Sequence, residues 1–233
     1  MTDTLPTNAA SPDAPPTADA IRAAELAAFM AARMCHDFIS PASAIVSGLD
    51  LLEDPSAQDM REDAMSLISA SARKLAEMLA FTRVAFGASA SAQAFDGREL
   101  EALARGVFGH MRAELDWRLE LDAVPKPVAR ALLNLAQMAG QALPTGGVAK
   151  VRAVQEATGV AIAVEAEGPR ARLRAEVLAG LRGEGPGEGL PGHWVQARYV
   201  HLFVTDAGGR VFAESGEERV VFAATIPTAS TAP

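Results

Sequence analysis

An apolar stripe with helical spacing constrains the first third of the chain more than any other feature. Apolar residues recur there every three or four positions, the spacing of one face of an α-helix; they are Met30, Met34, Phe38, Ala42, Ile45, Leu49 and Leu52. Residues 18–53 are also rich in alanine, leucine and methionine, which favour helices. Pro41 lies within this segment, where a proline removes a backbone donor and bends a helix. We therefore predict one long, bent helix over residues 18–53.

A second stripe follows a short break. Pro55 interrupts the pattern, because a proline disfavours helical geometry in the residue before it. Ser56 or Asp59 is the predicted N-cap of a second helix, along which helical spacing resumes in Met65, Ile68, Ala72, Leu75, Leu79 and Phe86. Two long helices joined by a short loop form an antiparallel hairpin, which we place over residues 18–87.

The hairpin alone has too little apolar area to bury. Its second helix carries a further mainly apolar face, made of Leu67, Ser71, Met78, Phe81 and Ala85. We predict that this face meets another copy of the chain and forms a four-helix bundle across a two-fold axis, so that the protein is a homodimer.

The pattern becomes mixed beyond a small-residue linker over residues 88–95. Helices are expected over residues 97–112, with Asp96 as N-cap, and over 128–141, 171–181 and 193–206. Alternation predicts strands over 117–121, 150–155, 160–165, 210–214 and 220–225. A sheet covered by helices on one face is an α+β two-layer sandwich, which we place over residues 96–227. The proline-rich residues 1–17 and the tail over 228–233 are expected to be disordered.

Composition excludes several classes of function. The formal net charge of −8 argues against nucleic acid and against an anionic membrane surface as partners. A single cysteine, Cys35, excludes an internal disulfide and a cysteine-rich zinc site. The sequence has neither a long apolar run nor the features of a signal peptide. We expect a cytoplasmic chain with no metal or cofactor of its own.

A polar face on the first helix carries the candidate chemistry. It is formed by Arg33, His36, Asp37, Ser40, Ser43 and Ser47. A histidine with an ordinary pKa of about 6.5 is partly neutral in the cell and is a usable nucleophile. A neighbouring aspartate accepts from the ring N–H and so favours attack by the other nitrogen. Ser40, one turn later, is placed to orient the group that is attacked.

The segment His36-Asp-Phe-Ile-Ser-Pro41 resembles the phosphoacceptor box of bacterial sensor histidine kinases, H-[E/D]-x-x-[T/S/N]-P. The resemblance implies that His36 accepts a phosphoryl group and that Asp37 and Ser40 assist it. Such kinases carry an ATP-binding domain of Bergerat type after the hairpin, with an asparagine box and two glycine boxes. Residues 96–227 resemble the framework of that domain.

Key ATP-binding positions depart from the kinase pattern. In the asparagine box, residues 132–139, Met138 replaces the asparagine that binds magnesium, and a thioether is a poor ligand for that cation. In the first glycine box, residues 164–170, Ala166 replaces the adenine-reading aspartate and Arg170 the second glycine. We interpret the glycine-rich residues 183–192 as a loop rather than a phosphate site.

This combination resembles the ChpT-type bacterial histidine phosphotransferases. Membership implies a homodimer that passes a phosphoryl group from the receiver of a hybrid kinase of CckA type, through His36, to response regulators of CtrA and CpdR type. It implies no ATP-dependent kinase activity, and Mg²⁺ supplied by the receiver. Two alternatives are a kinase with a divergent ATP site and a non-catalytic module that binds receivers.

Further residues are candidates for receiver docking. Arg170, Arg172 and Arg174 form a basic stripe in an acidic protein, interpreted either as a solvated helix start or as a docking patch. Phe81 belongs either to the receiver groove or to the bundle core. Arg33, Ser43 and Ser47 complete the predicted docking set. The length leaves no room for a sensor or receiver domain beside these two parts, so we expect the phosphoryl group to come from another protein.

Overall fold

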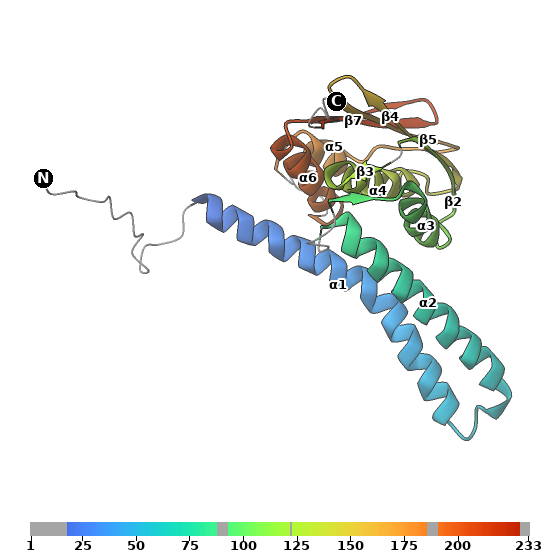
Figure 1. The fold of residues 1–233 in the computed structure, drawn as a ribbon. Coiled ribbons are helices and arrows are strands. Elements are labelled where there is room, and N and C mark those ends of the chain that lie inside the picture. Colours follow the sequence, from blue (N-terminus) through green and yellow to red (C-terminus); the bar gives the residue numbers. More distant parts are fainter. Residues whose placement is uncertain (1–17, 88–92, 122, 186–190, 229–233) are drawn as a thin grey trace, which may run out of the picture.

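The computed structural model describes residues 18–87, 93–121, 123–185 and 191–228, with side chains from residue 23. Two long helices form a hairpin that projects from a compact α/β part (Figure 1). Helix α1 spans Ala18–Glu53, a short 3-10 helix η1 spans Gln58–Met60, and α2 spans Arg61–Ala85. The predicted disorder of residues 1–17 lies outside the described residues, as does that of residues 229–233.

Helix α1 continues without interruption through Pro41, which is buried. Met30 and Gly48 are also buried on this helix. A Cβ on Gly48 would come within 2.6 Å of Ile68, so α1 and α2 approach closely there. Neither predicted N-cap starts α2: Ser56 bonds the carboxylate of Asp54, and Met60 precedes the helix without a side-chain cap.

The burial of the two faces of α2 agrees with the prediction only in part: Leu67 is exposed and Ile68 packs on Gly48 of α1, but other residues differ. Ser71, Phe81 and Ala85, which were expected to meet a second copy, are buried within the chain. Met65 and Leu79, which were expected to pack inside the hairpin, are exposed. Helical spacing identified both faces, but it could not show that the end of α2 packs against the α/β part. The predicted contact with a second copy is therefore wrong for Ser71, Phe81 and Ala85.

The α/β part is a five-stranded sheet with helices on one face (Figure 1). Its order is β2-β4-β5-β7-β6, in which β2 is parallel to β4 and the other neighbours are antiparallel. In chain order the elements are β1 (Ala94–Phe95), α3 (Gly97–Phe108), β2 (Ala113–Glu120), β3 (Val124–Pro125), α4 (Lys126–Gln141), β4 (Gly147–Glu156), β5 (Gly159–Glu167), α5 (Ala175–Leu181), α6 (Pro191–Asp206), β6 (Arg210–Gly216) and β7 (Arg219–Pro227). This arrangement confirms the α+β class with a hairpin followed by a sheet and helices.

Several local details differ from the sequence-based expectations. Residues 94–95 were assigned to the linker, but they pair with β3 as a two-residue ladder. Helix α5 begins later than predicted, at Ala175, and α6 begins at Pro191 inside the glycine-rich segment. Asp96 is confirmed as an N-cap, because its carboxylate accepts from the backbone N–H of Arg98.

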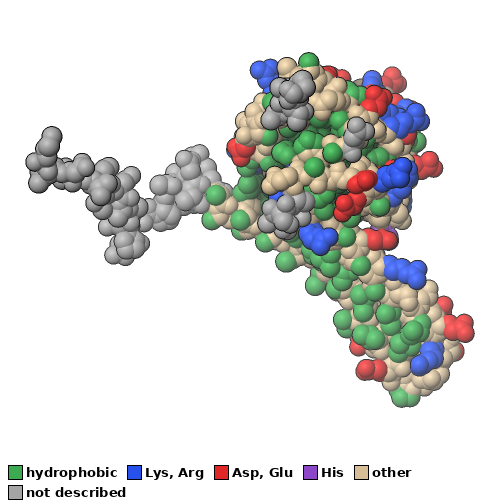
Figure 2. Space-filling model, viewed as in Figure 1, with side chains coloured by type: hydrophobic (Ala, Val, Ile, Leu, Met, Phe, Trp, Pro, Cys, Tyr) green, Lys and Arg blue, Asp and Glu red, His purple; other side chains and the backbone are tan. Residues whose placement is uncertain are grey.

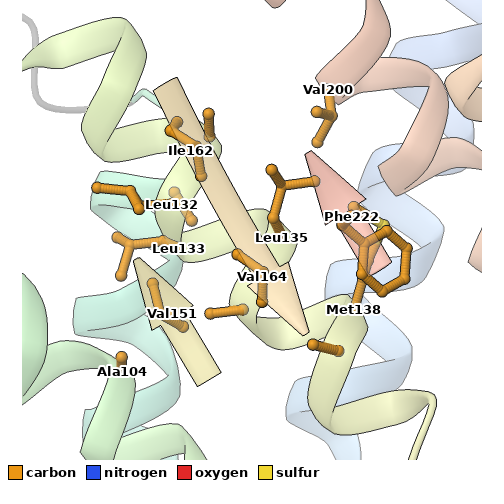
Figure 3. Packing of buried hydrophobic residues seen from close by; sticks show 14 of the residues in the cluster. Ala104, Leu132, Leu133, Leu135, Met138, Val151, Ile162, Val164, Val200 and Phe222 are labelled. Carbon is orange, nitrogen blue, oxygen red and sulfur yellow. The ribbon is translucent and has the colours of Figure 1, made fainter. Parts of the chain in front are cut away.

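The core forms where α4 packs on the sheet. Leu132, Leu135 and Met138 project from α4 toward Ile162 and Phe222 on the strands (Figure 3). The cluster continues into the hairpin, since the buried Phe81, Val84 and Ala85 of α2 belong to it. Hairpin and sheet therefore share one hydrophobic core, which fixes the end of α2 against the α/β part.

Asn134 reinforces this connection. Its side-chain amide is fully buried and donates to the carbonyl oxygens of Ala85, at 2.8 Å, and of Arg130, at 2.9 Å. Its oxygen accepts from the buried amide of Gln196 on α6, at 3.0 Å. One side chain thus satisfies polar groups from α2, α4 and α6, which would be costly to leave unpaired inside the core.

We expect Asn134→Ala to lower the free energy of unfolding by about 1–3 kcal/mol, because it leaves buried polar groups unsatisfied. Urea denaturation followed by circular dichroism measures this change. Gln58→Ala is the matched control, since Gln58 also donates to a carbonyl, that of Asp54, but at an exposed site. Its effect should stay within about 0.5 kcal/mol. Equal effects of the two substitutions would contradict the role given to Asn134.

Candidate functional site

His36 stands on the outer surface of α1 with its side chain 87% exposed. Its Nδ1 lies 3.3 Å from Oδ1 of Asp37, the next residue. When Nδ1 carries the proton it donates to this carboxylate, and Nε2 is left with a free lone pair directed away from the partner. Ser40, Ser43 and Ser47 are exposed along the same side of the helix. The predicted polar strip is therefore present from His36 to Ser47.

Arg33 does not belong to this exposed strip. Only 9% of its side chain is accessible, and Nη1 donates to the backbone carbonyl of Gly192 at the start of α6. Its Nε lies 3.7 Å from Oδ2 of Asp37, one turn further along α1. Burial lowers the pKa of the Arg33 guanidinium, and the charge of Asp37 opposes that shift. Sequence reasoning grouped Arg33 with the surface residues because spacing alone does not show where α6 lies.

A groove of about 760 Å³ adjoins the polar strip at the junction of the hairpin and the α/β part. We call it the junction groove. Its walls come from α1, α2, α4 and the C-terminal end of α3 with the turn that follows. They combine apolar and aromatic side chains with cationic and amide groups: Arg33, Met34, Asp37, Phe38, Lys74, Met78, Phe81, Thr82, Phe86, Val107, His110, Met111, Gln137 and Gln141.

The junction groove brings together only part of the predicted site. Arg33, Asp37 and Phe81 line it, although Phe81 is 2% exposed and also belongs to the core. Lys74 and His110 were not predicted. Lys74 lies two turns before Phe81 on α2, so helical spacing could have placed it on the same face as Phe81. His110 follows α3 and bonds Glu77 of α2 at 2.7 Å, a contact that no local pattern indicates.

The arginine stripe lies beside a second, smaller pocket. Arg172 and Arg174 line this pocket together with Gln141, which also lines the junction groove. Arg170 is exposed and has a φ of 61°, in the left-handed region that glycine adopts most readily. The loop thus keeps a backbone suited to the glycine that the resemblance expects at this position.

The two positions that depart most from an ATP site are part of the core. Met138 on α4 and Ala166 on β5 are 3% and 0% exposed. Met138 packs beside Phe222 of β7 (Figure 3). Neither side chain presents an oxygen ligand to a cation.

His193 lies on the wall of the smaller pocket, near the start of α6. Its Nδ1 is buried without a hydrogen-bond partner. Desolvation lowers the pKa of His193, and the charges of Arg174 and Arg33 lower it further, while Glu176 and Asp37 oppose the shift. The electrostatic environment of this histidine therefore includes Arg174 of the arginine stripe and the Arg33–Asp37 pair on α1.

Neither a membrane-spanning helix nor a metal-binding cluster is present in the described ranges. Among their helices, none combines the length and apolar character that a membrane span needs. In the same ranges, no three histidine, cysteine or carboxylate side chains gather into a set able to hold a metal ion.

Comparison with known proteins links the chain to phosphotransfer. Residues 97–219 match the family model of the histidine phosphotransferase C-terminal domain. Protein phosphotransferase ChpT of Brucella abortus (strain 2308) is 34% identical over 205 residues, covering 88% of this chain and 97% of the relative. A 1.7 Å structure of a bacterial phosphotransferase superposes with a TM-score of 0.76 at 33% identity, covering 87% of this chain and 96% of that one.

We expect His193→Gln to weaken the dependence of stability on pH below neutrality. Because the folded-state pKa is lowered, the unfolded chain binds the proton more readily. The contribution of neutral His193 is thus present above its unfolded pKa of about 6.5 and is lost as pH falls through the folded value. Thermal unfolding at pH values from about 7 to 5 measures it.

The informative quantity in this experiment is the stability difference between wild type and His193→Gln, which should shrink toward acid pH. His36→Gln, which changes an exposed histidine, provides the baseline. A difference that stays constant or grows as pH falls would contradict the expected sign.

Proposed function

The chain belongs to the ChpT-type family of histidine phosphotransferases, and we propose that it relays a phosphoryl group between receiver domains through His36. The observation that carries this proposal is the exposed imidazole of His36, whose Nδ1 faces the carboxylate of Asp37 while Nε2 is directed outward. The phosphoryl donor is the receiver of a hybrid kinase of CckA type. The acceptors are response regulators of CtrA and CpdR type.

The transfer is a reversible displacement at phosphorus. The lone pair of Nε2 attacks the phosphoryl group on the receiver's aspartate; the N–P bond forms as the P–O bond breaks, and the receiver's carboxylate departs. Nδ1 keeps its proton and donates to Asp37, which stabilises the cationic ring. Ser40 lies one turn along the exposed strip, within the area that a docked receiver would cover. Positioning supplies most of the catalysis in phosphoryl transfer.

Charge neutralisation comes from the partner. The relay requires Mg²⁺, which the receiver would hold. This chain contributes the side chains of His36, Asp37 and Ser40. On this proposal the α/β part has no ATP-dependent kinase activity. The side chains of Met138 and Ala166 support that view, because neither offers a polar ligand: Met138 contributes a thioether to the wall of the smaller pocket, and Ala166 is fully buried.

Docking of an acidic receiver face is favoured by cations around the site. Lys74 lines the junction groove. Arg172 and Arg174 line the smaller pocket, which shares Gln141 with the groove, and Arg170 is exposed in the same loop. Opposite charges steer encounter and fix register, while apolar side chains such as Phe81 contribute to the groove wall. Ser43 and Ser47 extend the contact along α1.

The active form is proposed to be a homodimer built on the hairpin. Ile39 and Val46 lie seven residues apart on α1 and are 62% and 56% exposed. Met65 and Leu79 are exposed on α2, and hydrophobic side chains gather along the visible hairpin surface (Figure 2). An apolar stripe with heptad spacing is typical of helix packing in a four-helix bundle. Burying it against a second copy removes these side chains from water.

We expect His36→Ala to abolish labelling of this chain by a phosphorylated CtrA-type receiver in the absence of ATP. The label on the wild type should be stable in base and labile in acid, as an N–P bond is. His110→Ala is the matched control, because His110 also pairs with a carboxylate but is proposed to be only a wall of the groove. It should still be labelled.

Other outcomes of this experiment identify the alternatives. Label that persists on His36→Ala would refute the relay through this residue. Labelling of the wild type by Mg·ATP alone would show a divergent kinase. Receiver binding without any transfer, to wild type or variant, would show a non-catalytic binding module.

We expect Val46→Glu to dissociate the dimer, because it places a charge in the apolar stripe. Sedimentation equilibrium should give the monomer mass at concentrations where the wild type is dimeric. Leu67→Glu is the control, since Leu67 is also exposed on α2 but lies on a different flank. A monomeric wild type, or dissociation by both variants alike, would contradict the proposed face.

A further inference from the structure

We propose that Arg33 is a positioning residue that connects the α/β part to the phosphoacceptor. Its guanidinium donates to the carbonyl of Gly192 on α6 and reaches Asp37, whose other oxygen faces His36. The chain of contacts runs from α6 through Arg33 and Asp37 to the imidazole. This inference rests on the proposed function of His36 and assigns the α/β part a role in it.

The surroundings of Arg33 argue that it acts on Asp37. A guanidinium with 9% of its side chain accessible has lost most of its hydration, and such a charge is retained only where it is paired. Its ion-pair partner is the carboxylate next to His36, at 3.7 Å. His110 lines the same groove but bonds Glu77, at 2.7 Å, rather than Asp37. Lys74 also lines the groove.

The contact divides the two oxygens of Asp37 between different partners. Oδ2 faces Nε of Arg33, and Oδ1 lies 3.3 Å from Nδ1 of His36. A carboxylate held on one side has fewer rotamers to sample, so its second oxygen stays available to the imidazole. Arg33 thereby favours the tautomer with the proton on Nδ1 and leaves Nε2 free to attack.

Arg33 is not required to hold α1 against α6. That contact already has its own apolar cluster, in which Met30 packs with Trp194 and Val195. Phe29 adds an edge-to-face contact with the ring of Trp194, at 6.2 Å between centroids. Removing the guanidinium leaves this packing in place. The substitution should therefore change the position of the Asp37 carboxylate more than the stability of the fold.

The test separates chemistry from docking. In Arg33→Met, which keeps length but removes the charge, we expect the maximal rate of transfer from a saturating phosphorylated receiver to fall about 10-fold to 100-fold, by analogy with residues that orient metal-binding histidines. Receiver affinity, measured by calorimetry, should change less than about twofold. Arg33→Lys should recover part of the rate, since an ammonium retains the charge but lacks the guanidinium's planar fork.

Phosphoramidate serves as a second donor that requires no receiver docking. His36 attacks its phosphorus and ammonia departs, so the rate reports on the imidazole itself. The slowing in Arg33→Met should persist with this donor. Arg105→Met is the matched control, because Arg105 forms a similar pair four residues apart, with Glu101 at 2.7 Å on α3. It should react like the wild type.

Two measurements exclude a merely structural effect. If Arg33 acts through Asp37, Arg33→Met should cause no further loss in an Asp37→Asn background. Nitrogen-15 NMR of the His36 ring should show less of the tautomer protonated on Nδ1 in Arg33→Met. Should that variant fail to fold, Arg33→Lys provides the same rate and NMR comparisons.

Three results would overturn the inference: wild-type rates in the Arg33 variants, losses that multiply with Asp37→Asn, or an unchanged tautomer. A wild type that accepts phosphate from phosphoramidate but not from any receiver would instead contradict the proposed relay, and the role of Arg33 would be judged from the phosphoramidate rates.

Discussion

The shared core at the end of α2 determines how the rest of the molecule is arranged. Phe81, Val84 and Ala85 belong to the same apolar cluster as the helices and strands of the α/β part. Asn134 adds a buried hydrogen bond to the carbonyl of Ala85. Because separating the two parts would expose this core and leave polar groups unpaired, the hairpin and the sheet are held in one relation. The junction groove exists because of that relation.

The sequence predicted the helices and strands better than it predicted which of them pack together. Periodicity located the hairpin helices, since their apolar spacing is long and regular. It could not decide which side of α2 is internal, because Phe81 and Leu79 are both apolar and only the tertiary fold buries one of them. The ladder between β1 and β3 was missed for a similar reason: each strand has two residues, too few to show alternation.

In the candidate site, too, residues close in sequence were predicted and contacts between distant segments were not. His36 and Asp37 are adjacent in sequence, so a motif within one helix was enough to identify the pair. The groove draws residues from distant segments, such as His110 and Gln137, and no pattern within one helix relates them. Arg33 illustrates the limit most clearly, because its helical position indicates a surface residue until α6 is placed over it.

The burial of Ala166 and Met138 limits which substitutions the α/β part can accept at these positions. Both side chains now contribute to a packed interior, where a carboxylate or an amide without partners is strongly unfavourable. A single substitution to aspartate or asparagine at either position would therefore destabilise the fold before it supplied a ligand. If this domain descends from an ATPase, its core packing would have adapted after the nucleotide ligands were lost. Each such adaptation would make it harder to regain nucleotide binding through single substitutions.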